Sequence, residues 1–310
     1  MQRENLRKKF LGCLLGVAVG DALGACWEGR LMSQEGEIES LTEKLGWLTY
    51  TDDTHMTIGV VESLIDSKGF HGEHMLQTFI RNYEAEPWRG YGPGPPRIFR
   101  MIRAGEPWDR AASKLYKGGS LGNGAAMRVA PIGLLCSTDP AKLREVAYKS
   151  STLTHCHQLG KEGAAVEAYA VALATNTTSD REVDPEVFIQ ELHNFAQHPL
   201  YRQKIACIRE LLGEKDRARV VSVLGNGVEA LNSVPTAIYC FLRHPRSYKD
   251  SVLYAISLGG DTDTIAAMTG AISGAYLGVE AIPGSWRAKL ENRPYIEALA
   301  EKLWQLAKQR

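Results

Sequence analysis

The chain has 310 residues, 44% of them hydrophobic and 13 of them proline, the ordinary composition of a soluble globular protein that can bury a sizeable core. Lys plus Arg and Asp plus Glu each total 36, so the zero net charge argues against bulk nucleic-acid binding. The six cysteines are scattered without a CxxC pair, which favours free thiols in a reducing compartment and predicts a cytoplasmic protein.

The N-terminal segment has a basic start and an apolar run over residues 10–19, the outline of a signal peptide. Asp21 and three glycines interrupt that run, so a buried first helix is the favoured interpretation. The glycines, Gly12, Gly16 and Gly20, would line one helix face and allow close packing against a neighbour. No other apolar run reaches the ~20 residues of a membrane span, so no membrane association is expected.

The first motif with chemical content is the cluster Thr51-Asp52-Asp53-Thr54, directly ahead of apolar residues at helical spacing from Met56 to Ile65. A second cluster, Asp261-Thr262-Asp263-Thr264, precedes the apolar stretch 265–277. Carboxylates beside buried sequence destabilise a fold unless they are paired or bind a metal. Hard divalent cations such as Mg²⁺ take oxygen ligands, so the two clusters folded together would form a two-metal site.

Helix capping is the plainer explanation of either cluster alone, because Asp and Thr are preferred N-cap residues. Capping needs only one acceptor oxygen, whereas the first cluster offers two adjacent carboxylates. The helix macrodipole does not favour a cation at an N-terminus. A metal there would need several carboxylates, and the two clusters together supply four.

A glycine-rich stretch from Lys117 to Arg128 lies between the clusters. Such a loop exposes backbone N–H groups, and a helix N-terminus after it would favour a phosphate or diphosphate. It matches neither the P-loop pattern nor GxGxxG after a strand, and a plain glycine-rich turn is at least as common. The triplet His155-Cys156-His157 lacks the spacing of a zinc site, and by position alone His155 is more often a packed histidine. Glu28 is likewise more often an exposed surface glutamate.

Helical periodicity dominates the rest of the chain, at 143–147, 163–174, 234–242 and 265–277, and convincing strands are missing. Residues 90–96 (GYGPGPP) predict a loop between helices, and 176–184 predict a surface excursion. The predicted fold class is all-α, a compact multi-helix bundle in a single domain over residues 1–310.

Together the motifs GxxxGDALGxxxE, YTDDT, GNGAAMR, a Thr-His pair and LGGDTDT resemble the ADP-ribosylglycohydrolase family. They occur in the family's order from about residue 11 to residue 284. The segments 224–243 and 256–264 are especially similar to the subclass typified by animal ADP-ribosylhydrolase 3.

The resemblance implies an all-helical fold around two Mg²⁺ ions. The implied metal ligands are Thr51, Asp52, Asp53, Asp261, Asp263 and Thr264. The implied catalytic residues are Glu28, with an acid/base and gating role, Asp52 and Asp261. The implied substrate-binding residues are Asp53, Gly119, Ser120, Leu121, Gly122, Asn123, Gly124, Met127, His155 and Val228, with the glycine loop around a diphosphate.

The sequence departs from the family where animal members carry aromatic residues that stack on adenine, because it has Leu115 and Leu121 there. Tyr116 is a candidate substitute, and residues 176–222 match no family motif. The implied activity is Mg²⁺-dependent hydrolysis at C1″ of ADP-ribose conjugates, with O-linked substrates preferred. ADP-ribosyl-arginine hydrolysis and a non-catalytic ADP-ribose-binding module are the alternatives. We expect a monomer that acts on an ADP-ribose-bearing protein or small molecule.

Overall fold

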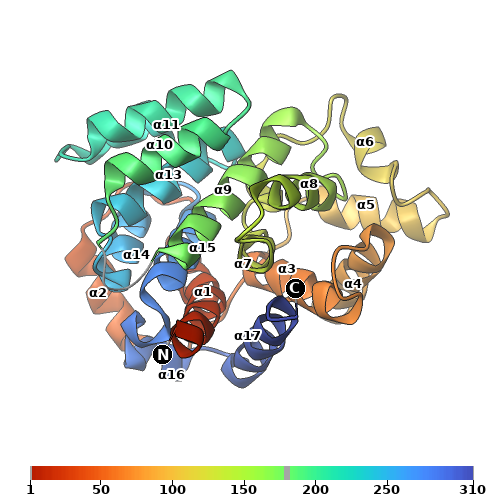
Figure 1. Cartoon of the computed structure of the whole chain (residues 1–310), viewed down its shortest axis with the longest axis horizontal. Helices are drawn as coiled ribbons and strands as arrows, with labels where there is room; N and C mark the ends of the chain where they lie inside the picture. The colour runs from red at the N-terminus through yellow and green to blue at the C-terminus, as the bar shows by residue number, and fades with distance from the viewer. Residues whose placement is uncertain (1, 178–181, 310) are drawn as a thin grey trace.

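The computed structural model describes residues 2–177 and 182–309, and in these ranges helices occur without strands (Figure 1). The helices are α1 (Gln2–Gly24), η1 (Ala25–Trp27), α2 (Glu35–Lys44), α3 (Asp52–Asp66), α4 (Gly72–Ala85), α5 (Gly94–Arg103), α6 (Ala111–Leu115), η2 (Asn123–Ala125), α7 (Ala130–Leu135), α8 (Pro140–Ser151), α9 (Gln158–Asn176), α10 (Pro185–Phe195), α11 (Pro199–Leu211), α12 (Arg217–Leu224), α13 (Ala230–Arg243), α14 (Tyr248–Ser257), α15 (Thr262–Leu277), η3 (Val279–Ala281), α16 (Gly284–Lys289) and α17 (Arg293–Ala307). The all-α prediction is confirmed. The predicted excursion 176–184 lies partly outside the described residues.

Helices α1 and α15 pack against each other along their lengths at the centre of the molecule (Figure 1). The predicted glycine face of α1 makes this contact. A Cβ atom on Gly12, Gly16 or Gly20 would overlap the backbone of α15 at Gly274, Gly270 or Ala266, respectively. Because the contact is between backbones, the two helices are fixed in register as well as in distance.

Helix α1 is also the single described helix long and apolar enough to cross a membrane by length and composition. In its most apolar window, 83% of the residues are buried inside the protein. This burial fits the interpretation of α1 as a core helix.

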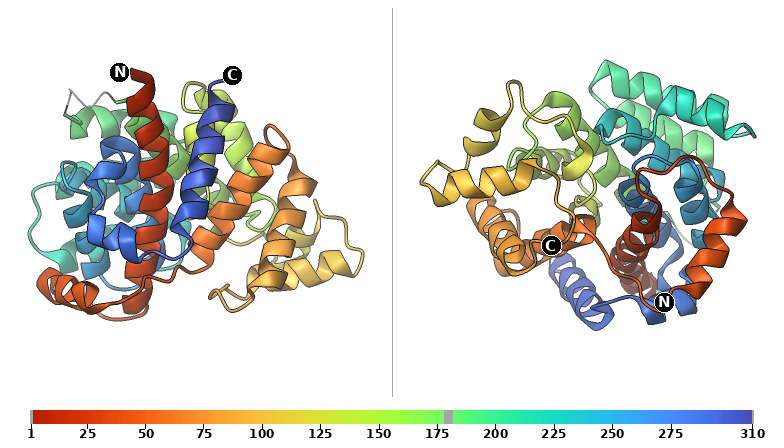
Figure 2. Two further views of the ribbon diagram at one scale, coloured as in Figure 1. Left: turned by 90° about the horizontal axis from the view of Figure 1, so that it is seen from below. Right: turned by 180° about the vertical axis from the view of Figure 1, so that it is seen from behind.

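The other long apolar helices surround this pair. Helix α13 packs against α15 and α9, and the predicted all-round apolar segment 234–242 is buried throughout. Helix α17 returns to pack on α1 and α3, which places both chain ends on the same side of the molecule (Figure 2). Helix α3, which begins with the first acidic cluster, is thereby held by helices that belong to opposite ends of the chain.

Two predicted loops differ from the structure in their extent. The loop predicted over 90–96 ends early, because α5 begins at Gly94 and carries Pro95 in its first turn. Proline is favoured there, since its fixed φ suits the helix and its missing N–H is not needed. The glycine-rich loop is followed by the short 3₁₀ turn η2, and the next α-helix, α7, begins only at Ala130.

Candidate metal and ligand site

The first acidic cluster forms the start of α3. Helix capping explains its first threonine, but it does not explain the two carboxylates. Thr51 is the N-cap, and its hydroxyl accepts a hydrogen bond from the Asp53 N–H at 3.4 Å. Asp52 and Asp53 occupy the first turn, so neither carboxylate is needed as the cap. Asp53 is buried, and its Oδ1 atom has no hydrogen-bond partner in the described part of the chain.

A residue that the sequence analysis did not assign to the site, Asp21, holds this turn in place from α1. Its carboxylate accepts hydrogen bonds from the backbone N–H groups of Thr51 and Thr54 at 3.0 Å and from both threonine hydroxyls. Asp21 is fully buried. The signal in the sequence was a lone Asp inside an apolar helix, where a carboxylate is rarely found without partners.

The second cluster begins α15, and here capping does not explain the carboxylates. Asp261 is at the N-cap position, but its side chain makes no capping hydrogen bond. Instead, its Oδ2 atom accepts a hydrogen bond from Nδ2 of Asn123 in the glycine-rich loop. Its backbone N–H donates to the carbonyl of Asn226 at 2.8 Å. The carboxylate therefore faces the space between α15 and the glycine-rich loop.

The two glycines before Asp261 bring Glu28 to the same place. Gly259 and Gly260 have φ values of +70° and +77°, which favour glycine, and side chains there would overlap neighbouring backbone. Gly29 N–H donates to the Gly260 carbonyl at 2.9 Å, and Gly260 N–H donates to the Arg30 carbonyl at 3.1 Å. This pairing fixes the segment that carries Glu28 against the start of α15.

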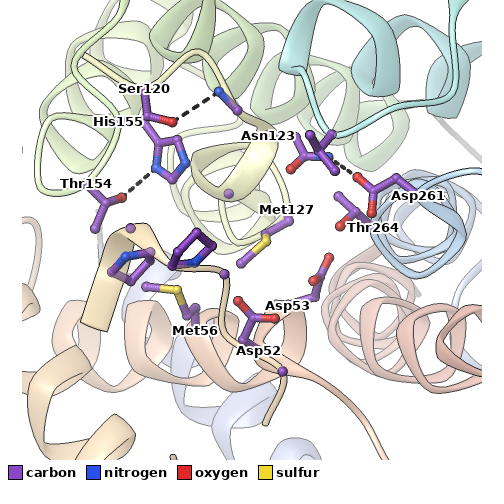
Figure 3. A pocket seen from close by; sticks show the side chains of 18 of the residues that line it. Asp52, Asp53, Met56, Ser120, Asn123, Met127, Thr154, His155, Asp261 and Thr264 are labelled. Carbon is purple, nitrogen blue, oxygen red and sulfur yellow. Dashed lines mark hydrogen bonds between the residues drawn. The ribbon is translucent and has the colours of Figure 1, made fainter. Parts of the chain in front are cut away.

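Glu28, Asp261 and Asp263 each offer a carboxylate oxygen within 4.8 Å of the others. Asp52 and Asp53 extend from α3 toward Asp261 and Thr264 across the same cavity (Figure 3). The cavity has a volume of about 320 Å³. The predicted juxtaposition of the two clusters, which lie far apart in the sequence, is therefore present in the structure.

The carboxylates of the site repel one another in a poorly solvated space. Burial raises the pKa of Asp52 to about 7, with the charge of Asp21 as the next cause. Burial and the charge of Asp261 raise the pKa of Asp263 to about 9. The pKa of Asp53 is also raised, by burial and then by the charges of Asp263, Asp21, Asp52 and Asp261. The charges that raise the pKa of Asp53 are all negative. Among the described residues, no Lys, Arg or His forms a salt bridge with Asp52, Asp53, Asp261 or Asp263.

A divalent cation fits this donor set. The donors are carboxylate and hydroxyl oxygens, which Mg²⁺ prefers, and one buried carboxylate oxygen, Oδ1 of Asp53, is otherwise unpartnered in the described chain. A bound cation would supply the missing positive charge and restore the ordinary ionisation of the carboxylates. Of the predicted ligands, Asp52, Asp53, Asp261, Asp263 and Thr264 line the cavity and could hold the cation, with Glu28 beside them, whereas the Thr51 hydroxyl donates to Asp21.

The opposite end of the cavity is formed by the glycine-rich loop and His155. The loop is paired with the segment before α13, because Asn123 N–H donates to the Val228 carbonyl at 2.9 Å and Ala230 N–H donates to the Leu121 carbonyl at 3.1 Å. This pairing brings Val228 to the cavity although it is distant in sequence. His155 lies beside Gly122 and Gly124.

Most predicted site residues line the cavity. They are Glu28, Asp52, Asp53, Ser120, Gly122, Asn123, Gly124, Met127, His155, Val228, Asp261, Asp263 and Thr264. Thr51, Gly119 and Leu121 do not line it. Gly119 instead packs against the backbone of Cys156 and His157, where a side chain would not fit.

Tyr116, the candidate substitute for the missing aromatic residues, also lines the cavity. Further lining residues were not assigned to the site from the sequence, and they are Met56, Gly90, Gly92, Pro93, Gly94, Pro95 and Thr154. Tyr116 lies against Gly94, because its ring and hydroxyl would be 3.6 Å from a Cβ atom added to that glycine. The Tyr116 side chain therefore faces the cavity, whereas Leu115 packs partly buried against the core.

Comparison with known proteins identifies the family to which the chain belongs. Residues 2–310 match the ADP-ribosylglycohydrolase family. The chain is 38% identical to ADP-ribosylhydrolase ARH3 of Mus musculus, over 95% of this chain and 90% of that protein. It is 37% identical to ADP-ribosylhydrolase ARH3 of Homo sapiens, over 95% of this chain and 92% of that protein. A solved structure described as an ADP-ribosylglycohydrolase-related protein complex is 26% identical with a TM-score of 0.76, covering 98% of this chain and 99% of that one.

The chain therefore belongs to the ADP-ribosylglycohydrolase family. The resemblance drawn from its motifs is confirmed, including the similarity to the ADP-ribosylhydrolase ARH3 proteins.

Proposed function

We propose that this protein is a Mg²⁺-dependent hydrolase that cleaves the bond at C1″ of O-linked ADP-ribose conjugates, such as ADP-ribosyl-serine, poly(ADP-ribose) or O-acetyl-ADP-ribose. The observation that carries the proposal is the arrangement of the cavity, with a carboxylate cluster at one end and a glycine-rich loop at the other. The ADP-ribosylhydrolase ARH3 relatives, 37–38% identical, support the choice of O-linked substrates.

The residues of the chain have separable tasks in this reaction. The glycine-rich loop and His155 offer N–H donors to the diphosphate, which places the terminal ribose at the carboxylate end. Hydrolysis breaks the bond from C1″ to the acceptor oxygen, and a water oxygen takes its place on C1″. Glu28 is the exposed carboxylate of the cluster, so it can accept a proton from the water and return one to the leaving oxygen.

The predicted ligands would hold two Mg²⁺ ions. Bound Mg²⁺ supplies positive charge that orients the ribose hydroxyls and polarises the water. Asp52 and Asp261 lie on opposite sides of the cavity, from α3 and α15, and therefore set the position of the ribose between the two helices.

ADP-ribosyl-arginine hydrolysis is the second candidate, since the same cavity would hold the same ADP-ribose. A non-catalytic ADP-ribose-binding module is the third. The convergence of Glu28 with Asp261 and Asp263 disfavours the binding module, because binding a diphosphate requires the loop but not a buried cluster of carboxylates. We also propose a monomer in the cytoplasm, a reducing compartment that suits six cysteines scattered without a CxxC pair.

The decisive experiment is hydrolysis of two matched peptides that carry ADP-ribose on serine or on arginine, each with Mg²⁺ and with EDTA. We expect Mg²⁺-dependent release of ADP-ribose from the serine peptide at a kcat/KM at least about 10²-fold above that of the arginine peptide, the scale of discrimination between good and poor substrates. Preference for arginine would contradict the O-linked assignment. Binding of ADP-ribose without hydrolysis of either peptide would favour the binding module.

A further inference from the structure

Arg128 is the largest fully buried side chain, and its contacts lead toward the cavity. One guanidinium nitrogen, Nη2, donates to the Thr154 hydroxyl at 2.7 Å and to the Ser150 carbonyl at 3.3 Å. The guanidinium also lies 4.8 Å from the centre of the Phe79 ring. Burial lowers the pKa of Arg128 to about 9, so the group is still charged at neutral pH.

The Thr154 hydroxyl has two partners, and their chemistry determines where its proton lies. Its oxygen accepts from Arg128, which can only donate. Its second partner is Nδ1 of His155, at 2.7 Å (Figure 3). Thr154 is buried at the wall of the cavity, and among the described residues the partners of its hydroxyl are Arg128 and His155. The hydroxyl therefore donates to Nδ1, because the reverse arrangement would leave the O–H proton buried without an acceptor.

A His155 ring that accepts at Nδ1 carries its proton on Nε2. Burial and the charge of Arg128 lower the pKa of His155 to about 3, so the ring is neutral at physiological pH. A Cβ atom placed on Gly124 would lie 3.0 Å from Nε2, and one placed on Gly122 would lie 3.5 Å away. Nε2 thus faces the glycine-rich loop, and no protein acceptor meets it within the described ranges.

We propose that Arg128 and Thr154 are positioning residues that hold His155 as the Nε2–H tautomer, so that the ring donates a hydrogen bond to an anionic oxygen on the glycine-rich loop. This inference rests on the proposed function for the identity of that oxygen, which would belong to the diphosphate of ADP-ribose. Arg128 sets the direction of the Thr154 hydroxyl, and Thr154 sets the tautomer of His155. Arg128 itself does not touch the ligand.

A purely structural role for Arg128 would predict a different result. In that case its hydrogen bonds to Met56 Sδ of α3 and to the Ser150 carbonyl of α8 would only join these two helices, and loss of the Thr154 hydroxyl would change stability alone. The tautomer of a histidine is visible in the ¹⁵N shifts of its two ring nitrogens, independently of stability or catalysis.

The test uses full-length protein labelled with ¹⁵N-histidine, with the His155 signals assigned by their loss in His155→Gln. We expect a neutral Nε2–H ring in the wild type and in Thr154→Ser, and a mixture of tautomers in Thr154→Val. Affinity for ADP-ribose in the presence of Mg²⁺ should fall about 5- to 10-fold in Thr154→Val, as for loss of one well-oriented hydrogen bond, and be restored in Thr154→Ser. Arg128→Met should also give mixed tautomers.

Thr152→Val is the matched control, because Thr152 is on the same turn but its hydroxyl bonds only to the Lys149 carbonyl among the described residues. A wild-type Nδ1–H ring, or a Thr154→Val variant with unchanged tautomer and affinity, would overturn the proposal. If Arg128→Met does not fold, the tautomer of the wild type and the results for the two Thr154 variants still test the proposal. Absence of hydrolysis or of ADP-ribose binding would count against the proposed function, whereas the tautomer measurement would stand by itself.

Discussion

Glu28 differs from the other carboxylates of the site because it is exposed while Asp261 and Asp263 are buried. It also lies outside any α-helix, directly after η1. Its place beside Asp261 depends on the backbone pairing of the next residues with Gly260. An exposed carboxylate can exchange protons with solvent. Because backbone hydrogen bonds hold its loop in place, the fold does not depend on the side chain itself.

Replacement of Glu28 by Gln should therefore separate chemistry from stability. We expect Glu28→Gln to lower kcat by roughly 10²–10⁴-fold, the usual effect of losing general acid–base help, with the melting temperature unchanged. Affinity for ADP-ribose should change little, because the loop and the cluster ligands remain. Glu37→Gln is the matched control, since Glu37 is exposed on α2 and does not line the cavity. Wild-type kcat in Glu28→Gln would remove Glu28 from the mechanism.

Asp263 should affect activity and stability in opposite directions. Asp263→Asn removes one of the mutually repelling carboxylates, so the metal-free protein should melt at a higher temperature than the wild type. The same change removes an implied ligand, and we expect turnover with Mg²⁺ to fall at least about 10²-fold. Thermal melting in EDTA and hydrolysis in Mg²⁺ measure the two effects. Retained turnover would mean that the second cluster only begins a helix.

At the scale of helices, the sequence pattern was sufficient to predict α1, α3 and α15, because each has apolar residues at helical spacing or a run of small residues. The role of Asp21 was not predictable in the same way. Its hydrogen bonds are made to Thr51 and Thr54, and they exist only because α1 docks at the start of α3. One amino-acid sequence taken alone does not specify which helix ends contact each other in the folded protein.

The glycine face of α1 was predicted, but its partner was not. The structure identifies α15 as that partner, and the contact continues to Gly24, whose carbonyl accepts from the Thr262 hydroxyl at 2.9 Å. The same pair of helices carries Asp21 and Asp263. Because Asp21 also holds the start of α3, the close contact of α1 with α15 positions both acidic clusters as well as the core.

An alanine at Gly16 should disturb this contact. The added Cβ would overlap the backbone carbonyl of Gly270, and backbone cannot move aside as a side chain can. We expect Gly16→Ala to lower the free energy of unfolding by about 1–3 kcal/mol or more, as in other overpacked cores. Gly36→Ala, in α2 with open space around the Cβ, is the matched control and should be neutral or slightly stabilising. Equal stability of the two variants, measured by chemical denaturation, would contradict tight packing of α1 on α15.

At the scale of the whole molecule, the site combines segments that are far apart in the sequence, among them the end of η1, the start of α3, the glycine-rich loop, His155 and the start of α15. The family resemblance predicted most of these residues, because the motifs that carry it contain the residues that line the cavity. It did not predict the contribution of Gly90 to Pro95, whose sequence resembles an ordinary loop. These residues reach the cavity only through the packing of α5 and α6 around it.

The stability of the metal-free protein should depend on pH in a direction that these contacts determine. The folded-state pKa values of Asp52 and Asp263 are raised to about 7 and about 9, above the unfolded value near 3.8. Between those limits the folded state binds more protons than the unfolded state, so stability falls as pH rises. We expect the melting temperature in EDTA to fall between pH 6 and pH 9, by roughly 2–4 °C for each kcal/mol lost.

Mg²⁺ should remove this dependence, because a cation stabilises the ionised carboxylates and binds only the folded site. The increase in melting temperature on adding saturating Mg²⁺ should therefore be larger at pH 9 than at pH 6. Asp263→Asn is the control, since it lacks the group with the pKa of about 9 and should show a shallower slope in EDTA. Melting curves that are parallel with and without Mg²⁺ across this range would mean that the cation does not bind the carboxylate cluster.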